Sequence, residues 1–106
     1  MRKGLVVLVP FPFTDLSGQK VRPALVLHVS KGEDCIVAFI SSAKGRKGSF
    51  DIKMKATILN GLKVDSVLKV DKLATLQRKI VLGELGTAEK HIIASADASL
   101  RKLFKL

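Results

Sequence analysis

The sequence has no tryptophan, no tyrosine and one cysteine, Cys35. A single cysteine excludes a disulfide bond within the chain and fits a reducing compartment, so we expect a small core residue in a cytoplasmic protein. The two histidines are far apart in the sequence, without patterned cysteines or carboxylates beside them, and therefore predict no metal site. No phosphate-cradling loop or dinucleotide fingerprint is present, so we expect no cofactor.

Long apolar runs are also missing. The N-terminal apolar stretch ends at Pro10 with no cleavage site after it, so it does not predict a signal peptide. No segment approaches the roughly 18 apolar residues that a membrane-spanning helix needs. We therefore expect no membrane partner.

Acidic residues are scarce relative to basic ones, with 9 against 19, which gives a formal net charge of +10. Such a balance favours a nucleic-acid partner, because cationic side chains release the counterions of a polyanion. An acidic protein, or no charge-specific partner, are the alternatives. The hydrophobic fraction of 47% is high for so small and basic a chain, and we expect part of it to be buried in a homodimer.

The length of 106 residues predicts one domain, residues 1–106. Short apolar or alternating segments predict strands at residues 6–9, 23–29, 35–40, 50–54, 66–70 and 81–85. Between them we expect a loop at 10–20, turns at 31–34 and 60–61, and a short helical turn at 71–76. Many short strands with tight turns predict a mainly β, small barrel.

The C-terminal segment has helical periodicity instead. Apolar residues recur at spacings of three and four from residue 88 to about Phe104, with Thr87 as a candidate cap and Asp97 placed to pair with Arg101. We expect an amphipathic helix that covers one end of the sheet, with Phe104, like Phe39, in the core.

Arg22 is the first candidate functional residue. Pro23 biases it to an extended backbone and fixes the start of an apolar strand, so its side chain leaves from a defined place. A guanidinium is a planar fork of donors that matches phosphate oxygens. The alternative is an ordinary arginine at a strand end.

Hydroxyl and acidic side chains gather at other strand ends. If residues 23–29 and 35–40 form a hairpin, Ser41 lies beside Arg22, and a hydroxyl next to a guanidinium can bind an oxyanion. Ser41 and Ser42 could equally cap the strand. Asp65, which precedes Ser66, could orient Arg22 or cap a turn.

Other candidates lie on loops. The loop at 44–48 carries Lys44, Arg46 and Lys47 between two glycines, and could follow a nucleic-acid backbone or be a solvated turn. Phe11 and Phe13 lie in the segment that leads to Lys20 and Arg22, and they are the aromatic residues best placed to stack on bases.

The two histidines are expected to have no role in such a site. His28 lies mid-strand, where a packing role is expected, and His91 lies in the first helical turn, where we expect exposure.

The order of these motifs resembles the MazF/PemK toxin family. The resemblance rests on Gly4, on residues 6–13 (VVLVPFPF) and 20–26 (KVRPALV), and on Ile40-Ser41-Ser42, Gly61-Leu62 and Asp65-Ser66-Val67. It covers essentially the whole chain. Two positions depart from the family pattern: Leu5 stands where an acidic residue is common, and Ser41 replaces a threonine but keeps the hydroxyl.

The resemblance implies a dimeric SH3-like barrel that acts as a metal-independent endoribonuclease on single-stranded RNA. It implies that a 2′-hydroxyl attacks the adjacent phosphate, with Arg22 and Ser41 at the reacting group. For such an activity, the RNA-binding residues that we predict from the sequence are Phe11, Phe13, Lys20, Ser42, Lys44, Arg46, Lys47, Asp65 and Ser66. It also implies an antitoxin with an acidic tail.

Two other functions are compatible with this resemblance. One is a non-catalytic gyrase poison of the same fold, although that branch depends on a Trp-containing C-terminal tail, and this chain ends in Arg101-Lys102-Leu103-Phe104-Lys105-Leu106. The other is an inactive RNA-binding module, since function resides in the site and not in the fold.

Overall fold

The computed structural model describes residues 1–11, 20–42 and 47–106, with the backbone alone at Phe11. The elements are β1 (Leu5–Phe11), β2 (Lys20–Val29), β3 (Asp34–Ser42), β4 (Asp51–Met54), β5 (Ser66–Gln77), the 3-10 helix η1 (Arg78–Ile80), β6 (Gly83–Thr87) and α1 (Lys90–Phe104). In the described part of the chain, no helix is long and apolar enough to cross a membrane.

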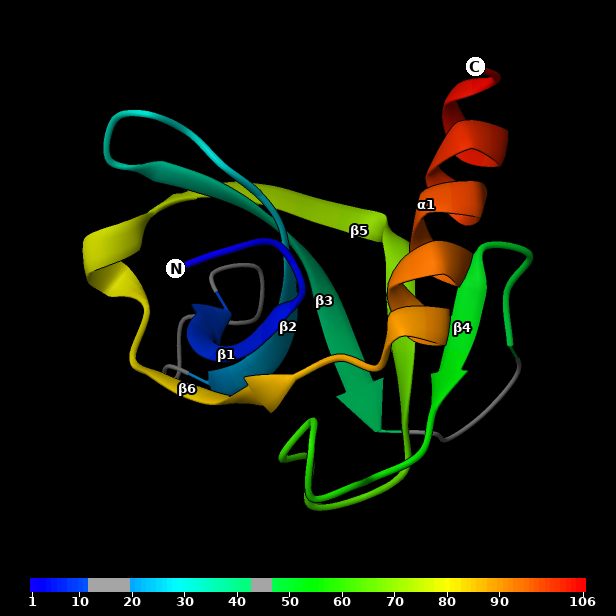
Figure 1. Cartoon of the computed structure of the whole chain (residues 1–106), viewed down its shortest axis with the longest axis horizontal. Helices are drawn as coiled ribbons and strands as arrows, with labels where there is room; N and C mark the ends of the chain where they lie inside the picture. The colour runs from blue at the N-terminus through cyan, green and yellow to red at the C-terminus, as the bar shows by residue number, and fades with distance from the viewer. Residues whose placement is uncertain (12–19, 43–46) are drawn as a thin grey trace.

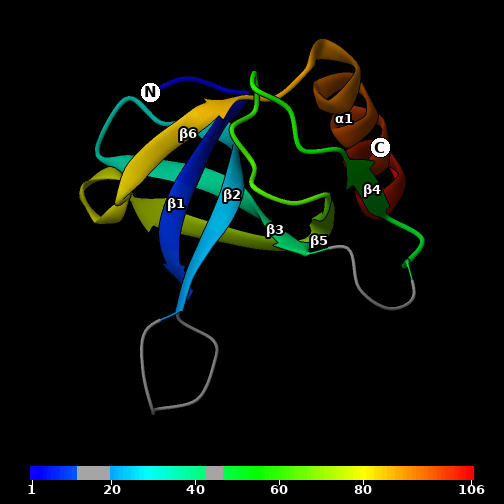
Figure 2. The same cartoon turned by 90° about the horizontal axis from the view of Figure 1, so that it is seen from below.

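The strands form one antiparallel sheet of six strands in the order β4-β5-β3-β2-β1-β6. Figure 1 shows the sheet curling so that β1, β2 and β6 wrap around one end, while β4 lies beside α1 at the other. Turning the molecule shows α1 standing against β4, away from β6 (Figure 2). The curled sheet with one terminal helix confirms the expected mainly β, small-barrel class.

Alternation along the strands divides the apolar residues between two clusters. Val6, Leu25 and Leu68 belong to the core on which α1 packs with Ile92 and Ala96. Their neighbours in the sequence face the other way, and the cluster on that side contains Val7, Val9, Val26, Cys35 and Phe39. Consecutive residues of β2 and β3 therefore belong to different clusters, and these apolar strands are buried on both faces.

The segment between β4 and β5 is fixed by Asn60, whose side chain is fully buried. Its carbonyl oxygen accepts hydrogen bonds from the N–H groups of Thr57 and Leu62, and its amide donates to the Lys55 carbonyl and the Glu89 carboxylate. The next residue, Gly61, has a φ of +72°, as expected of the predicted turn. This network ties the segment to the start of α1.

Several sequence predictions about the elements were wrong. Residues 71–76 are not a helical turn but the second half of β5, where Leu73 pairs with Ala38 and Leu76 with Cys35. The last strand lies at Gly83–Thr87 and not at 81–85. Both errors arise because pairing with distant strands overrides the local pattern.

The predicted ends of the C-terminal helix also need correction. Thr87 ends β6 and its hydroxyl accepts a hydrogen bond from Arg2, while Glu89 occupies the N-cap position. Asp97 forms an ion pair with Lys3 at 2.8 Å instead of the expected pair within the helix. Phe104, expected in the core, is 56% exposed.

The structure also shows the surroundings of two strand residues, His28 and Cys35. His28 is exposed on β2, contrary to the expected packing role. Cys35 is buried on β3 as predicted.

Candidate active site

The hairpin of β2 and β3 brings Arg22 and Ser41 together. Ala24 pairs with Phe39, and the alternation of antiparallel strands then places Arg22 and Ser41, two residues further along, on the same face. Both side chains line a pocket of about 190 Å³ with Phe39 and Ile40. The arrangement therefore places a guanidinium and a hydroxyl at one opening, as the hairpin predicted.

Two further cations, Lys69 and Lys72 on β5, line the same pocket. β5 pairs with β3, and Lys69 lies directly opposite Phe39. Three residues with cationic side chains and one with a hydroxyl thus border the pocket, and such donors are those expected of a site for a phosphate group. Neither lysine was among the sequence candidates.

Asp51 on β4 balances one of these charges. Its Oδ2 accepts hydrogen bonds from the Lys69 ammonium and from the Gly48 N–H, both at 2.7 Å. Burial alone would raise the pKa of the Asp51 carboxyl, but these hydrogen bonds and the charges of Lys69 and Lys47 outweigh burial and lower it. Asp51 is therefore a carboxylate at neutral pH.

The other predicted residues on the strands take different positions. Lys20 is exposed at the start of β2, on the same face as Arg22. Ser42 is exposed at the end of β3 and pairs with Ser66. Ser66 is buried, and its hydroxyl donates a hydrogen bond to the Val64 carbonyl, so it is turned away from the Arg22 pocket.

The predicted loop residues are placed only in part. Asp65 accepts a hydrogen bond from the Ala56 N–H, which fits the alternative of a turn-stabilising residue. Lys47 is exposed beside Asp51, whose pKa its charge lowers. Phe13, Lys44, Arg46 and the side chain of Phe11 lie outside the described residues.

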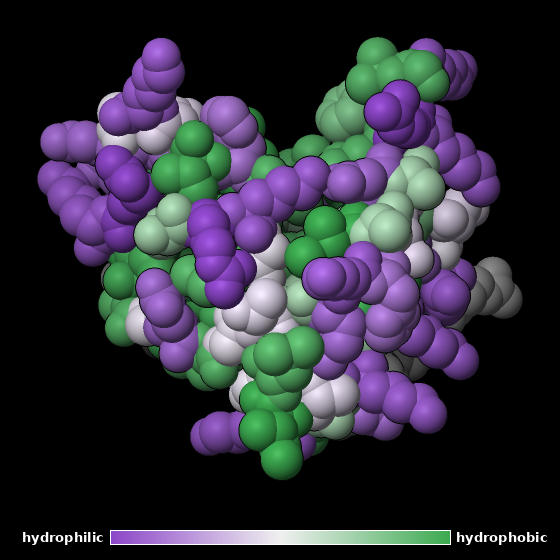
Figure 3. Space-filling view, viewed as in Figure 1, coloured by the Kyte–Doolittle hydropathy of each residue, from purple (hydrophilic) through white to green (hydrophobic). Residues whose placement is uncertain are grey.

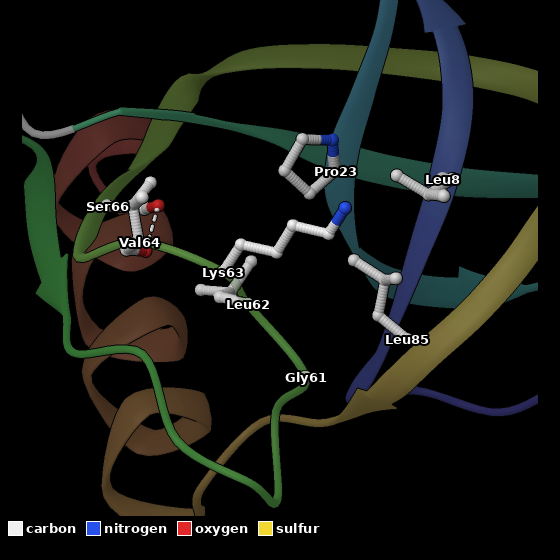
Figure 4. Close-up of a pocket in the computed structure, with 8 residues that line it drawn as sticks. All are labelled: Leu8, Pro23, Gly61, Leu62, Lys63, Val64, Ser66 and Leu85. Atoms are coloured by element: carbon white, nitrogen blue, oxygen red, sulfur yellow. Dashed lines mark hydrogen bonds between the residues drawn. The ribbon is translucent and has the colours of Figure 1, made fainter.

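A second pocket, of about 250 Å³, lies on the other face of the sheet. Figure 4 shows Leu8, Pro23 and Leu85 projecting into it from β1, β2 and β6, with Lys63 reaching toward them from the opposite wall. Among the described residues, Lys63 is the one charged residue in its lining, against three in the Arg22 pocket. This composition suits an apolar side chain better than a phosphate.

A third pocket, of about 330 Å³, lies between β4 and the start of α1 and is lined by Lys53, Lys55, Thr57, Glu89, His91 and Ile92. His91 is exposed, as predicted. Burial alone would raise the pKa of the Glu89 carboxyl, but hydrogen bonds from Thr57, the Glu89 backbone and Asn60, with the charge of His91, lower it. Among the described residues, no three His, Cys, Asp or Glu side chains are grouped so as to hold a metal ion.

Comparison with known proteins identifies the family. The model of the PemK-like, MazF-like toxins of type II toxin–antitoxin systems matches residues 2–104. The chain belongs to this family. No curated protein sequence matches the chain.

Solved structures of MazF proteins share the fold of this MazF-like chain. MazF from Deinococcus radiodurans is 20% identical, with a TM-score of 0.80, and the match covers 100% of this chain and 97% of that one. The Mycobacterium tuberculosis toxin MazF-mt6 is 19% identical, with a TM-score of 0.78 and coverage of 96% and 97%. An endoribonuclease from Mycobacterial species, in complex with its cognate antitoxin, is 16% identical, with a TM-score of 0.77 and coverage of 100% and 96%.

Sequence reasoning missed Lys69 and Lys72 for a physical reason. A lysine on a strand is usually a solvent-facing residue, and the local pattern does not show which residues of other strands these two approach. The pairing of β3 with β5 places Lys69 two residues along β5 from the partner of Ser41, and both lysines line the same pocket as Ser41. The usable signal was the interruption of the apolar run at 66–70 by Lys69.

Proposed function

We propose that this MazF-like toxin is a metal-independent endoribonuclease that cleaves single-stranded RNA at short sequence motifs. The observation that carries the proposal is the pocket in which Arg22, Ser41, Lys69 and Lys72 converge. The endoribonuclease named among the structures of the same fold supports it. The proposed product ends are a 2′,3′-cyclic phosphate and a 5′-hydroxyl.

The proposed reaction needs no nucleophile from the protein. The 2′-oxygen of the RNA attacks the neighbouring phosphorus and loses its proton, the bond from phosphorus to the 5′-oxygen breaks, and that oxygen gains a proton. The protein has to hold the phosphate in line and stabilise the negative charge on its non-bridging oxygens. Arg22 supplies a fixed fork of donors for those oxygens, and Ser41 adds a hydroxyl from the neighbouring strand.

The surface around the pocket suits a single strand of RNA. Lys20 lies on the same face of β2 as Arg22, and Lys47 lies beside Asp51, so cations are found on two sides of the pocket. Over the molecule more generally, hydrophilic side chains cover much of the one face that Figure 3 shows, in keeping with the net charge of +10. Of the remaining residues predicted to bind RNA, Phe11, Phe13, Ser42, Lys44 and Arg46 stay part of this proposal as contacts flanking the cut site. Asp65 and Ser66, whose hydrogen bonds join Ala56 and Val64, enter it as residues that shape the segment before β5.

The proposal includes a homodimer, an acidic antitoxin and action in the cytoplasm. Structures of the same fold from Deinococcus radiodurans contain MazE with MazF, at 22% and 21% identity. Exposed apolar side chains support protein partners, because Ile58, Leu59 and Leu82 are 103%, 54% and 60% exposed. The net charge of +10 favours an acidic partner that covers the RNA-binding surface.

The test is to incubate the purified protein with a long single-stranded RNA and to analyse the ends of each fragment. Repeated cuts at one short motif, with cyclic phosphate ends, are expected. A 2′-deoxy nucleotide placed at one mapped cut should remove that cut and leave the others, because the attacking group is gone. Cleavage that continues at the deoxy position would refute the proposed chemistry.

A further inference from the structure

Lys69 occupies an unusual position for a lysine in a sheet. It pairs with Phe39 on β3 and with Asp51 on β4, so it lies in the middle of three adjacent strands. Its Nζ is 2.7 Å from the Asp51 carboxylate. Lys69 also lines the pocket that contains Arg22 and Ser41.

The two partners of this ion pair differ in their access to solvent. The Asp51 side chain is 3% exposed, whereas the Lys69 side chain is 31% exposed. An ammonium group has three N–H donors, and the bond to Asp51 uses one of them. The pair therefore buries its carboxylate and leaves part of the Lys69 side chain exposed at the pocket.

Asp51 is itself held on a second side. The same oxygen that accepts from Lys69 accepts from the Gly48 N–H at 2.7 Å, next to the basic Lys47. A buried ion pair is weak evidence for stability, because apolar residues of similar volume often serve as well. Fixing the position of a cation is a function that apolar residues could not replace.

The register gives the position of Lys69 along the sheet. Ser41 pairs with Val67 on β5, and Lys69 is two residues further along that strand. At 3.3 Å per residue, the backbone of Lys69 is displaced by about 7 Å from the Arg22–Ser41 row. This displacement is comparable with the separation of neighbouring phosphates in a single strand of RNA.

We propose that Lys69 binds the phosphate next to the one held by Arg22, and that Asp51 is the positioning residue for this contact. The proposal rests on the function proposed above and extends it to a second phosphate. Lys69 would touch the RNA, while Asp51 would act through Lys69 and through the chain at Gly48.

The probe is an RNA oligonucleotide that carries a mapped cut site and is made uncleavable by one 2′-deoxy nucleotide. In a series of such oligonucleotides, a single phosphate at a time is replaced by an uncharged methylphosphonate. Affinity is measured by fluorescence anisotropy at several salt concentrations. Because no bond is cut, binding is read separately from catalysis.

For Lys69→Met we expect about a 10-fold loss of affinity, as for a charge-assisted hydrogen bond. The salt slope should fall by about 0.7, as for one phosphate contact on a single strand. Neutralising the neighbouring phosphate should weaken RNA binding by the wild type, but it should not further weaken RNA binding by Lys69→Met. Lys31→Met, in the turn at the far end of the β2–β3 hairpin, is the matched control and should bind as the wild type does.

Three variants separate positioning from folding. Lys69→Arg keeps a cation that can bind both Asp51 and a phosphate, and should restore affinity. Asp51→Asn should weaken binding without changing the salt slope, because the lysine charge stays. The double variant Asp51→Leu/Lys69→Met leaves no buried charge unpaired, should fold, and should bind as Lys69→Met does.

An unchanged affinity and salt slope in Lys69→Met, with a wild type that binds RNA, would overturn the assignment of Lys69 alone. The assignment would also be overturned if neutralising the scissile phosphate, and not its neighbour, were the change that no longer weakens binding by Lys69→Met. A folded wild type that binds no RNA would overturn the proposed function itself.

Discussion

Arg22 and Pro23 are consecutive in the sequence but line pockets on opposite faces of the sheet. Arg22 lies in the pocket with Ser41, and Pro23 lies in the apolar pocket with Leu8 and Leu85. Proline fixes its own φ and restricts the residue before it, so the backbone that carries the guanidinium is stiff on both counts. The guanidinium therefore leaves from a stiff strand start on one face of the sheet, while the proline ring lines the pocket on the other.

Replacing the hydroxyl at the pocket should reduce cleavage by a moderate amount. Ser41→Ala removes one hydrogen bond to a charged group, and we expect kcat to fall by about 10- to 100-fold. Ser41→Thr keeps the hydroxyl on the same strand and should retain most of the activity. Single-turnover cleavage of one RNA measures both variants, and equal activity of Ser41→Ala and the wild type would remove Ser41 from the mechanism.

Cleavage should not depend on a divalent cation. The proposed reaction draws its charge stabilisation from Arg22 and its neighbours, so the initial rate should be the same in EDTA and in Mg²⁺. The RNA in both reactions should be an unstructured oligonucleotide, so that Mg²⁺ does not alter the substrate. A rate that is lost in EDTA and restored by added metal would disprove the metal-independent mechanism.

The segment between β4 and β5 should tolerate no side chain at Gly61. Its φ is +72°, and a Cβ there would lie 2.1 Å from the Leu85 carbonyl oxygen. We expect Gly61→Ala to lower the free energy of unfolding by about 2–5 kcal/mol, from the left-handed backbone and the steric overlap together.

Gly32→Ala is the matched control for this substitution, because a Cβ at that position meets nothing within 4 Å. It should change the free energy of unfolding by less than about 0.5 kcal/mol. Urea denaturation followed by circular dichroism compares the two variants. Equal stabilities would show that the contact between this segment and β6 is not a tight one.

Acid should destabilise the protein through Asp51 and Glu89. Both carboxyls have a pKa below their ordinary values of 3.8 and 4.5, so the unfolded chain takes up protons before the folded one does. Their contribution to stability is fully present above those ordinary values and is lost as the pH falls through them toward the lower folded pKa.

We therefore expect these two groups to leave stability constant from about pH 6 to 8 and to reduce it steeply below about pH 4.5. Asp51→Asn should flatten the acid part of the profile of unfolding free energy against pH. Asp97→Asn, at an exposed ion pair with Lys3, should leave the profile close to that of the wild type. An unchanged profile for Asp51→Asn would contradict the role given to its ion pair with Lys69.

The sequence could predict the part of the site that local pairing creates. The turn at 31–34 joins two adjacent strands, and a hairpin fixes which residues at its open end are neighbours, so Arg22 and Ser41 could be placed together. The buried Cys35 and the terminal helix could be predicted for a similar reason, because each depends on a pattern within a short segment.

The rest depends on pairing between distant strands. β5 runs from Ser66 to Gln77 and pairs with β3 on both sides of a register shift at 70–72, whereas its second half looks helical when taken alone. Lys69 and Lys72 reach the pocket on this strand, and Asp51 reaches Lys69 from β4, the other neighbour of β5. The prediction that Phe104 lies in the core was wrong for a related reason. Helical periodicity shows which face of the helix is apolar but not where the sheet that covers this face ends.

The measurement that tests the central claim most directly is cleavage of one mapped RNA by the wild type and by Arg22→Ala, in EDTA, with Lys31→Met as a surface control. We expect the wild type and the control to cut at the same motif and leave cyclic phosphate ends. Arg22→Ala should keep the fold and lose cleavage by at least about 100- to 1,000-fold, because the main source of charge stabilisation is gone. Cleavage by folded Arg22→Ala at the wild-type rate would contradict the account.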